Sequence, residues 1–234
     1  MNFLALCQRV ASESGTINGT LPTAVTSQTG RLLKVVNWTA EAWNQIQGEH
    51  TTWKWMRAEF SGAVLTNTVR YTPASFNLTR HRAWITDEAH DAGAITVYAT
   101  ATGVSDETVL VRADWEDFRA MYLRGSQTAA RPIEYAVSPA GELCFGPKPD
   151  AAYTAQGEYY KSAQTLSANS DTPECPEEHH MTIVWRALKL LKIHDEDMVQ
   201  TKRDIDALHT DAMFALMASQ LPRPRVGPRA PALA

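Results

Sequence analysis

The spacing of apolar residues changes twice along this chain, and this change constrains the fold more than any other feature of the sequence. Apolar residues recur at helical spacing up to about residue 57, alternate with polar ones from residue 58 to about residue 165, and then return to helical spacing. A repeat of about 3.6 residues is typical of a helix, and a repeat of about two is typical of a strand. The sequence therefore predicts an α+β fold: a helical bundle from both chain ends, with an inserted antiparallel β region.

Residues 1–57 are the first predicted part of the bundle. A short helix is expected over residues 2–14 and a longer one over residues 27–47, because apolar side chains there recur with the i, i+4, i+7 spacing of one helical face. The apolar stripe of the longer helix consists of Leu32, Leu33, Val36, Ala40, Trp43 and Gln47.

Residues 58–165 are the predicted β region, since short alternating stretches are separated there by turn residues. A short helix over residues 114–123 interrupts the strands, with Asp114 in a suitable position for an N-cap. The expected strands cover residues 60–64, 69–71, 81–86, 94–99, 107–111, 133–137, 142–145 and 153–161.

Residues 166–220 are expected to form a helical hairpin that completes the bundle. Its first helix is predicted to start among the prolines and acidic residues of 171–178 and to end at His194, with an apolar surface wide enough to contact two neighbours. An acidic break at residues 195–197 separates it from the last helix. The apolar positions expected on that last helix are Ile205, Leu208, Ala212 and Leu216.

Residues 221–234 form a tail of different composition, because four prolines exclude regular structure and three arginines are its only charges. Ordering such a segment costs on the order of 1–2 kcal/mol per residue, which its few apolar side chains do not offset. We expect an extended tail that becomes ordered on a partner; a frayed terminus without a role is the alternative. The residues expected to bind that partner are Arg223, Arg225, Val226, Arg229 and Leu233.

The overall composition excludes several classes of protein. A formal net charge of -4 argues against a protein that coats DNA, although a mildly acidic lumen would let DNA slide past. The three cysteines are far apart and without a C-x-x-C motif, which favours reduced thiols over disulfides or a zinc ribbon. We find neither a signal peptide nor an apolar run of membrane-spanning length, so synthesis in the cytoplasm without a membrane partner is expected.

Three sequence patterns suggest chemistry, and each has a simpler explanation. Residues 87–90 spell the helicase sequence DEAH, but the chain lacks the phosphate-binding loop that this box requires. His179, His180 and His194 lack the i, i+4 spacing of a helical metal pair, so capping or interface roles are favoured. The tryptophans at 38, 43, 53 and 55 can stack nucleic-acid bases, but with few cations nearby a core is the better interpretation.

Carboxylates of the β region are the remaining candidates for catalysis. A glycosidase needs two carboxyl groups on either side of the bond that it cleaves. Glu59, Glu107, Asp114 and Glu116 lie in or near the predicted strands, outside any hydrolase motif, and the sequence leaves open whether two of them converge.

Packing and turn motifs occur in a characteristic order in two parts of the chain. The later part contains Arg131-Pro132, Leu143, Gly146-Pro147-Lys148-Pro149-Asp150, Tyr153, Gly157-Glu158-Tyr159-Tyr160-Lys161, Leu166, Asp171-Thr172-Pro173, Pro176 and His179-His180. The opening contains Phe3-Leu4-Ala5-Leu6-Cys7-Gln8-Arg9, Val35-Val36-Asn37-Trp38, Ala42-Trp43 and Trp53-Lys54-Trp55-Met56-Arg57. In order and spacing, these motifs resemble the head-to-tail adaptor (connector) proteins of tailed bacteriophages.

The resemblance implies a structural protein of the virion neck, without enzymatic activity, cofactor or metal. Such proteins form a ring of about twelve copies beneath the portal and link the DNA-filled head to the tail. The implied partners are the portal protein, a tail or nozzle protein and further copies of the chain, with DNA only passing through the channel. Assembly would take place in the host cytoplasm.

Two sets of residues are expected to make these contacts. The tail residues Arg223, Arg225, Val226, Arg229 and Leu233 would bind the portal. Contacts between subunits would use Leu32, Val36, Trp43, Trp185 and Leu188. Two alternatives remain open at this point, namely another neck component such as a tail-tube terminator, and a virion-associated peptidoglycan hydrolase.

Overall fold

The computed structural model describes residues 1–15, 21–86, 95–194 and 202–222. The chain divides into two compact units, a helical unit made of Met1–Met56 and the residues from Ala163 onward, and a β unit made of Arg57–Ser162. From the sequence, the corresponding transitions are expected after residues 57 and 165. The predicted α+β class is confirmed.

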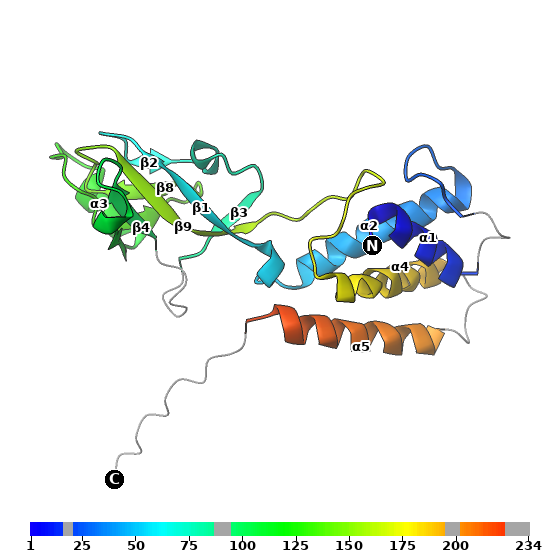
Figure 1. The fold of residues 1–234 in the computed structure, drawn as a ribbon. Coiled ribbons are helices and arrows are strands. Elements are labelled where there is room, and N and C mark those ends of the chain that lie inside the picture. Colours follow the sequence, from blue (N-terminus) through cyan, green and yellow to red (C-terminus); the bar gives the residue numbers. More distant parts are fainter. Residues whose placement is uncertain (16–20, 87–94, 195–201, 223–234) are drawn as a thin grey trace, which may run out of the picture. The chain divides into compact units, whose positions relative to one another are not determined.

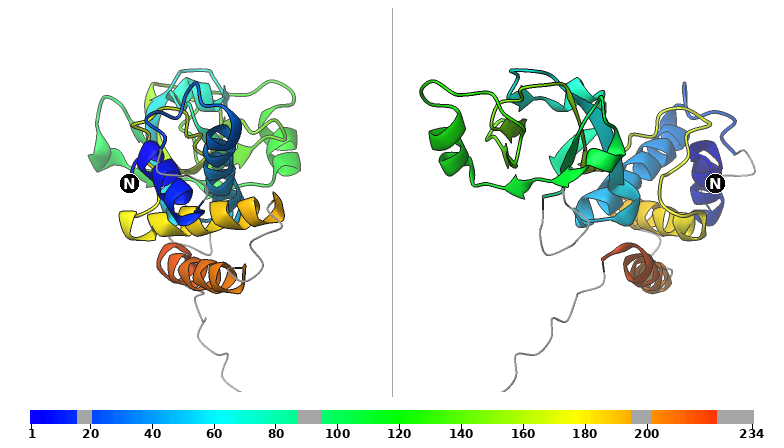
Figure 2. Two further views of the ribbon diagram at one scale, coloured as in Figure 1. Left: turned by 90° about the vertical axis from the view of Figure 1, so that its right-hand side faces the viewer. Right: turned by 60° about the vertical axis from the view of Figure 1, so that its left-hand side comes forward.

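The helical unit is built around one helix, α4, which contacts α1, α2 and α5. Figures 1 and 2 show α4 between α2 on one side and α5 on the other. The wide apolar surface predicted for α4 is thus covered by three helices of the same chain. The elements of this unit are α1 (Phe3–Glu13), α2 (Gly30–Glu49), the 3-10 turns η1 (Lys54–Met56) and η4 (Glu177–His179), α4 (His180–His194) and α5 (Lys202–Gln220).

The core of the helical unit follows from the apolar stripes of its helices. Leu6 and Val10 of α1, Trp43 of α2 and Leu188 of α4 are all buried. Asn2 begins α1 as its N-cap, and its side-chain oxygen accepts a hydrogen bond of 2.9 Å from the amide of Ala5.

The start of α4 differs from the prediction. A helix was expected from residues 171–178, but residues 171–176 are irregular, and helical geometry begins with η4 at Glu177. The reason is local: prolines 173 and 176 disfavour helical backbone at the residues before them, and Pro176 itself is extended, with ψ 143°. The Asp171 carboxylate also accepts the amides of residues 167 and 168, both at 2.7 Å, in a closed turn.

The β unit contains two sheets. In the five-stranded sheet, β9 is central: β1 pairs along one edge, and β4 and β3 share the other, with β5 beyond β4. The four-stranded sheet has the order β2-β8-β7-β6. The strands are β1 (Arg57–Val64), β2 (Arg70–Tyr71), β3 (His81–Trp84), β4 (Thr96–Ala99), β5 (Thr108–Val109), β6 (Val111–Arg112), β7 (Glu134–Val137), β8 (Leu143–Gly146) and β9 (Tyr153–Lys161).

One strand pair departs from the antiparallel arrangement that the sequence predicts. β6 pairs with β7 in parallel, with Val111 opposite Glu134 and Arg112 opposite Tyr135. Parallel neighbours need a long crossover connection. Helix α3 (Trp115–Tyr122) and the loop after it supply that connection between β6 and β7.

Both sheets contribute to one apolar core in the β unit. Phe60 and Ala155 come from the larger sheet, and Leu143 and Phe145 from the smaller one. A second, smaller cluster forms where Phe118 of α3 packs on Ala136 and Cys144.

Candidate functional site

The residues expected at subunit interfaces have different degrees of exposure. Val36, Trp43 and Leu188 are buried in the helical unit, with 8%, 0% and 1% of their surface exposed. Leu32 and Trp185 are partly exposed. Three of the five residues therefore contribute to the subunit's own core, and only the other two have surface left for a neighbour.

The residues expected to bind the portal, Arg223, Arg225, Val226, Arg229 and Leu233, lie outside the described residues. The same holds for the DEAH sequence at residues 87–90 and for the acidic break at residues 195–197.

The tryptophan cluster belongs to the core. The ring of Trp55 stacks on Trp53 at a centroid distance of 4.4 Å and on Trp43 at 6.1 Å. Trp43 and Trp53 are completely buried, and the Trp53 indole donates a 3.0 Å hydrogen bond to the carbonyl of Ile46. Completely buried rings present no face to a nucleic-acid base, so the core interpretation is supported for Trp43 and Trp53, whereas Trp38 and Trp55 are partly exposed.

Two histidines of the second helical part, His179 and His180, contact other segments of the helical unit. His179 Nε2 is 2.8 Å from Ser219 Oγ of α5. His180 is buried, and its Nε2 donates to the carbonyl of Cys175 at 3.1 Å. Burial, followed by the charge of the nearby chain amino group, lowers the pKa of His180. The side chain of His194 is outside the described residues.

Cysteine and metal chemistry have no support in the described part of the chain. Burial raises the pKa of the Cys7 and Cys175 thiols to about 12 and that of Cys144 to about 11, so all three remain protonated at neutral pH. Among the described residues, no group of three or more His, Cys, Asp or Glu side chains is arranged to hold a metal ion.

A hollow of about 520 Å³ lies on the five-stranded sheet and brings carboxylates together. Glu59 and Glu158 are opposite each other on β1 and β9, and Glu107 precedes β5. Arg57 balances one of these charges, since its Nε donates to Glu158 at 3.0 Å. The lining consists of Glu59, Phe60, Ser61, Thr96, Glu107, Gln156, Gly157 and Glu158.

The hollow therefore contains two of the four carboxylates named from the sequence. Glu59 and Glu107 line it, whereas Asp114 is the N-cap of α3 and Glu116 lies in its first turn. Glu158 was not among the predicted carboxylates, although its position opposite Glu59 in the pairing of β1 with β9 places it on the same face. Glu59 and Glu107 are exposed to water, which is not the apolar environment that a general acid needs.

Arg131 holds the segment that carries Glu107. Its guanidinium group donates to both carboxylate oxygens of Asp106 at 2.9 Å and to Thr108 Oγ1 at 2.7 Å. The hydrogen bonds from Arg131 are the main reason why the pKa of Asp106 is lowered. These charge-assisted hydrogen bonds hold Asp106 and Thr108 together and so support the start of β5.

An exposed apolar surface on α5 was not predicted either. Leu208 was expected on the buried stripe, but the buried residues are Ile205, His209, Met213 and Leu216, and Leu208 is 44% exposed. Phe214 is 65% exposed. Its position opposite the buried stripe was the available signal, because residues 205, 209, 213 and 216 follow one helical face.

None of the described helices combines the length and the apolar character that a membrane crossing would need.

These observations define a class of protein. The candidate residues are packing residues, and α5 has an exposed apolar face. Such a face is typical of a subunit that acts through assembly. The family model of the SU10 adaptor protein matches residues 1–232, so the chain belongs to the SU10 adaptor protein family. It is thus a phage adaptor protein with a structural role, and the resemblance to head-to-tail adaptors is confirmed. Among curated proteins, none matches this chain.

Proposed function

We propose that the protein forms a ring of about twelve copies beneath the portal and connects the DNA-filled head to the tail. The observation that carries this proposal is the match of the adaptor family over residues 1–232. The net charge of -4 supports it, since a mildly acidic ring would not retain DNA that passes through its channel.

The Pro/Arg tail is the proposed contact with the portal. Arg223, Arg225 and Arg229 carry its only charges, and guanidinium groups bind carboxylates in a fork geometry that lysine lacks. Val226 and Leu233 would supply apolar contacts. Portal binding then provides the free energy that orders the segment, so stable attachment requires a completed portal.

A binding experiment with purified portal rings tests this role. We expect the full chain to sediment with the rings and a chain without residues 222–234 to bind at least tenfold more weakly. Replacement of the three arginines by lysines keeps the charge and should weaken binding less than replacement by alanines. Unchanged binding of the truncated chain would remove the tail from the mechanism.

The two alternatives predict different partners. A tail-tube terminator would bind purified tail-tube protein and leave the portal rings unbound. A hydrolase would release fragments from peptidoglycan and lose that activity on Glu59→Gln or Glu107→Gln, because both carboxylates line the hollow. The adaptor proposal predicts portal binding that both substitutions leave unchanged.

A further inference from the structure

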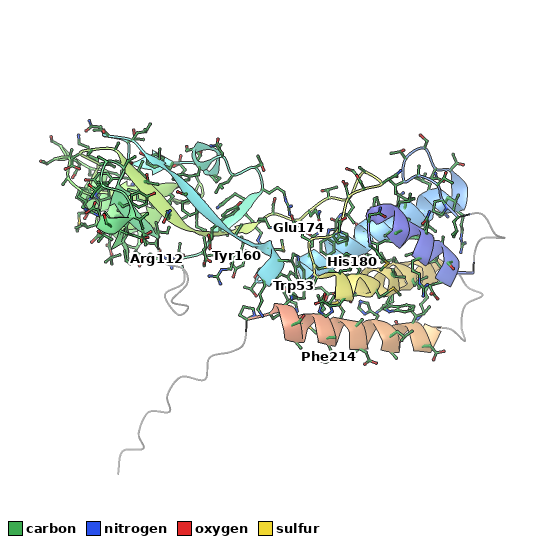
Figure 3. The ribbon with its side chains drawn as sticks, in the orientation of Figure 1. Trp53, Arg112, Tyr160, Glu174, His180 and Phe214 are labelled. Carbon is green, nitrogen blue, oxygen red and sulfur yellow. The ribbon has the colours of Figure 1, made fainter. Side chains whose placement is uncertain are left out.

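Helix α5 has two apolar faces, and the described residues cover only one of them. Ile205, Met213 and Leu216 are buried on the side that packs against α4. The opposite side carries Leu208 and Phe214, which are 44% and 65% exposed. Figure 3 shows Phe214 on the side of α5 turned away from α4. We call this surface the outer α5 face; it comprises Asp204, Ala207, Leu208, Asp211, Phe214, Ala215 and Ala218.

The outer α5 face has the composition of a contact surface. Ala215 and Ala218 are exposed beside Phe214, and such small side chains let another helix approach closely. Asp204 and Asp211 are also exposed, and their side chains make no ion pair or hydrogen bond within the described part of the chain. A partner that combines apolar and basic side chains would therefore complement this face.

The start of α2 has this complementary composition. Leu33 is 42% exposed, Leu32 is partly exposed, and Lys34 is exposed, with a side chain that has no ion-pair partner among the described residues. Arg31 adds a second basic side chain. We call Arg31, Leu32, Leu33 and Lys34 the α2 start.

The two surfaces belong to different helices of the helical unit. In Figures 1 and 2, α4 separates α2 from α5, and α4 contacts both helices. A cyclic ring requires two different, complementary surfaces on each subunit, so that one copy presents to the next what that copy can bind. Because the two surfaces belong to separate helices on either side of α4, a single copy cannot bring them together.

We propose that the outer α5 face docks on the α2 start of a second copy of this chain. Phe214 packs against Leu33 and Leu32, and Asp211 pairs with Lys34 of the neighbouring copy. The inference deepens the proposed ring by naming its subunit contact. It shifts that contact away from Val36, Trp43 and Leu188, which are buried in their own subunit.

Cross-linking tests the geometry of this contact. One preparation carries Leu33→Cys and another carries Ala215→Cys, so that a disulfide between the engineered positions must join two copies. The native cysteines are buried and do not compete. The two preparations are mixed and oxidised, both free at high concentration and after assembly with purified portal rings, and analysed without reductant.

The expected result is a covalent dimer from Leu33→Cys with Ala215→Cys. A matched control pairs Asn44→Cys, an exposed position further along α2, with Ala215→Cys, and should give at least tenfold less dimer. Equal yields for both pairs, or no dimer in either condition, would overturn the proposal. A further preparation carries Arg225→Cys in the tail. Preferential linkage of Ala215→Cys to this position would overturn the proposal as well, because the tail would then cover the outer α5 face.

Charge reversal tests the pairing. Asp211→Lys and Lys34→Asp should each reduce self-association about tenfold in sedimentation, and the double variant should recover most of the loss. Additive losses in the double variant would contradict a direct pair. Both side chains are exposed, so circular dichroism should show an unchanged fold. Portal binding of the same variants is measured as well, so that the proposed function and the proposed subunit contact are tested separately. A protein that cross-links as expected but does not bind the portal would reject the proposed function alone.

Discussion

At the scale of single residues, His209 is a buried group of the helical unit whose protonation responds to pH. It lies on the buried stripe of α5, and its Nε2 has no hydrogen-bond partner in the described structure. Burial, followed by the charges of Lys189 and Arg186, lowers the pKa of His209 from 6.5 to about 4. The folded protein therefore keeps this imidazole neutral.

This pKa predicts a stability that depends on pH. Well above pH 6.5 the imidazole is neutral in both states and the dependence is absent. As the pH falls through 6.5 towards 4, the unfolded chain binds a proton that the folded chain does not. The free energy of unfolding should fall by roughly 2 kcal/mol over that range. Urea titrations at several pH values measure it. His81 and His180 shift in the same direction, so the His209→Leu variant is needed, and an unchanged slope in that variant would contradict the assignment.

In the β unit, Gly62 is a position that no larger residue can occupy without a change in packing, because the core leaves no room for a side chain there. A Cβ atom at this position would be 2.2 Å from Cδ1 of Phe76. Gly62→Ala should lower the free energy of unfolding by about 1–3 kcal/mol, since the aromatic ring must move. Gly48 is the control: it lies inside α2 with open space around it, so Gly48→Ala should raise the stability by about 0.5–1 kcal/mol. Thermal denaturation of both variants measures the two changes in stability. Equal changes would contradict the close packing of Phe76 on Gly62.

At the scale of elements, Gln47 of α2 holds the segment that follows β9, through hydrogen bonds to Gln164. Its side-chain oxygen accepts from the amide of Gln164 at 2.6 Å, and its Nε2 donates to the carbonyl of Gln164 at 3.0 Å. Gln47 is buried, so a side chain without polar atoms would leave both backbone groups unpaired.

Gln47→Met should therefore destabilise the helical unit by about 2–3 kcal/mol, although methionine is similar in size. Asn44→Met, at an exposed position of the same helix, is the control and should change the stability by less than about 0.5 kcal/mol. Chemical denaturation compares the two. A neutral Gln47→Met variant would mean that the two hydrogen bonds do not hold this segment.

The sequence predicted most elements, and the failures have physical causes. The strand predicted over Tyr153–Lys161 matches β9 to the residue, although burial alternates only over its first part, from Tyr153 to Gln156. The start of α4 was missed since acidic residues and prolines also favour an irregular segment. The parallel pairing of β6 depends on a crossover through α3, and such a long-range contact leaves no trace in a local pattern.

The candidate surfaces were predicted less well than the elements. An apolar stripe shows that a helix face is covered, but not whether the same chain or another one covers it. Trp43 and Leu188 were therefore assigned to a subunit interface although they form the core. Phe214 lies opposite the stripe of residues 205, 209, 213 and 216, and the structure shows that this stripe, rather than the one through Leu208, is buried.

At the scale of the whole molecule, membership of the SU10 adaptor family and the arrangement of the helical unit support one account. The family assigns a structural role in the virion. The proposed docking of α5 on α2 would give each copy the two contacts that a closed ring needs. The Pro/Arg tail would add the contact with the portal.

Imaging of infectious particles tests this account most directly. Electron cryomicroscopy of the phage neck should show a closed ring of this chain that contacts the portal on one side and the tail on the other. Particles whose capsid vertex contains no density for the chain would contradict the account.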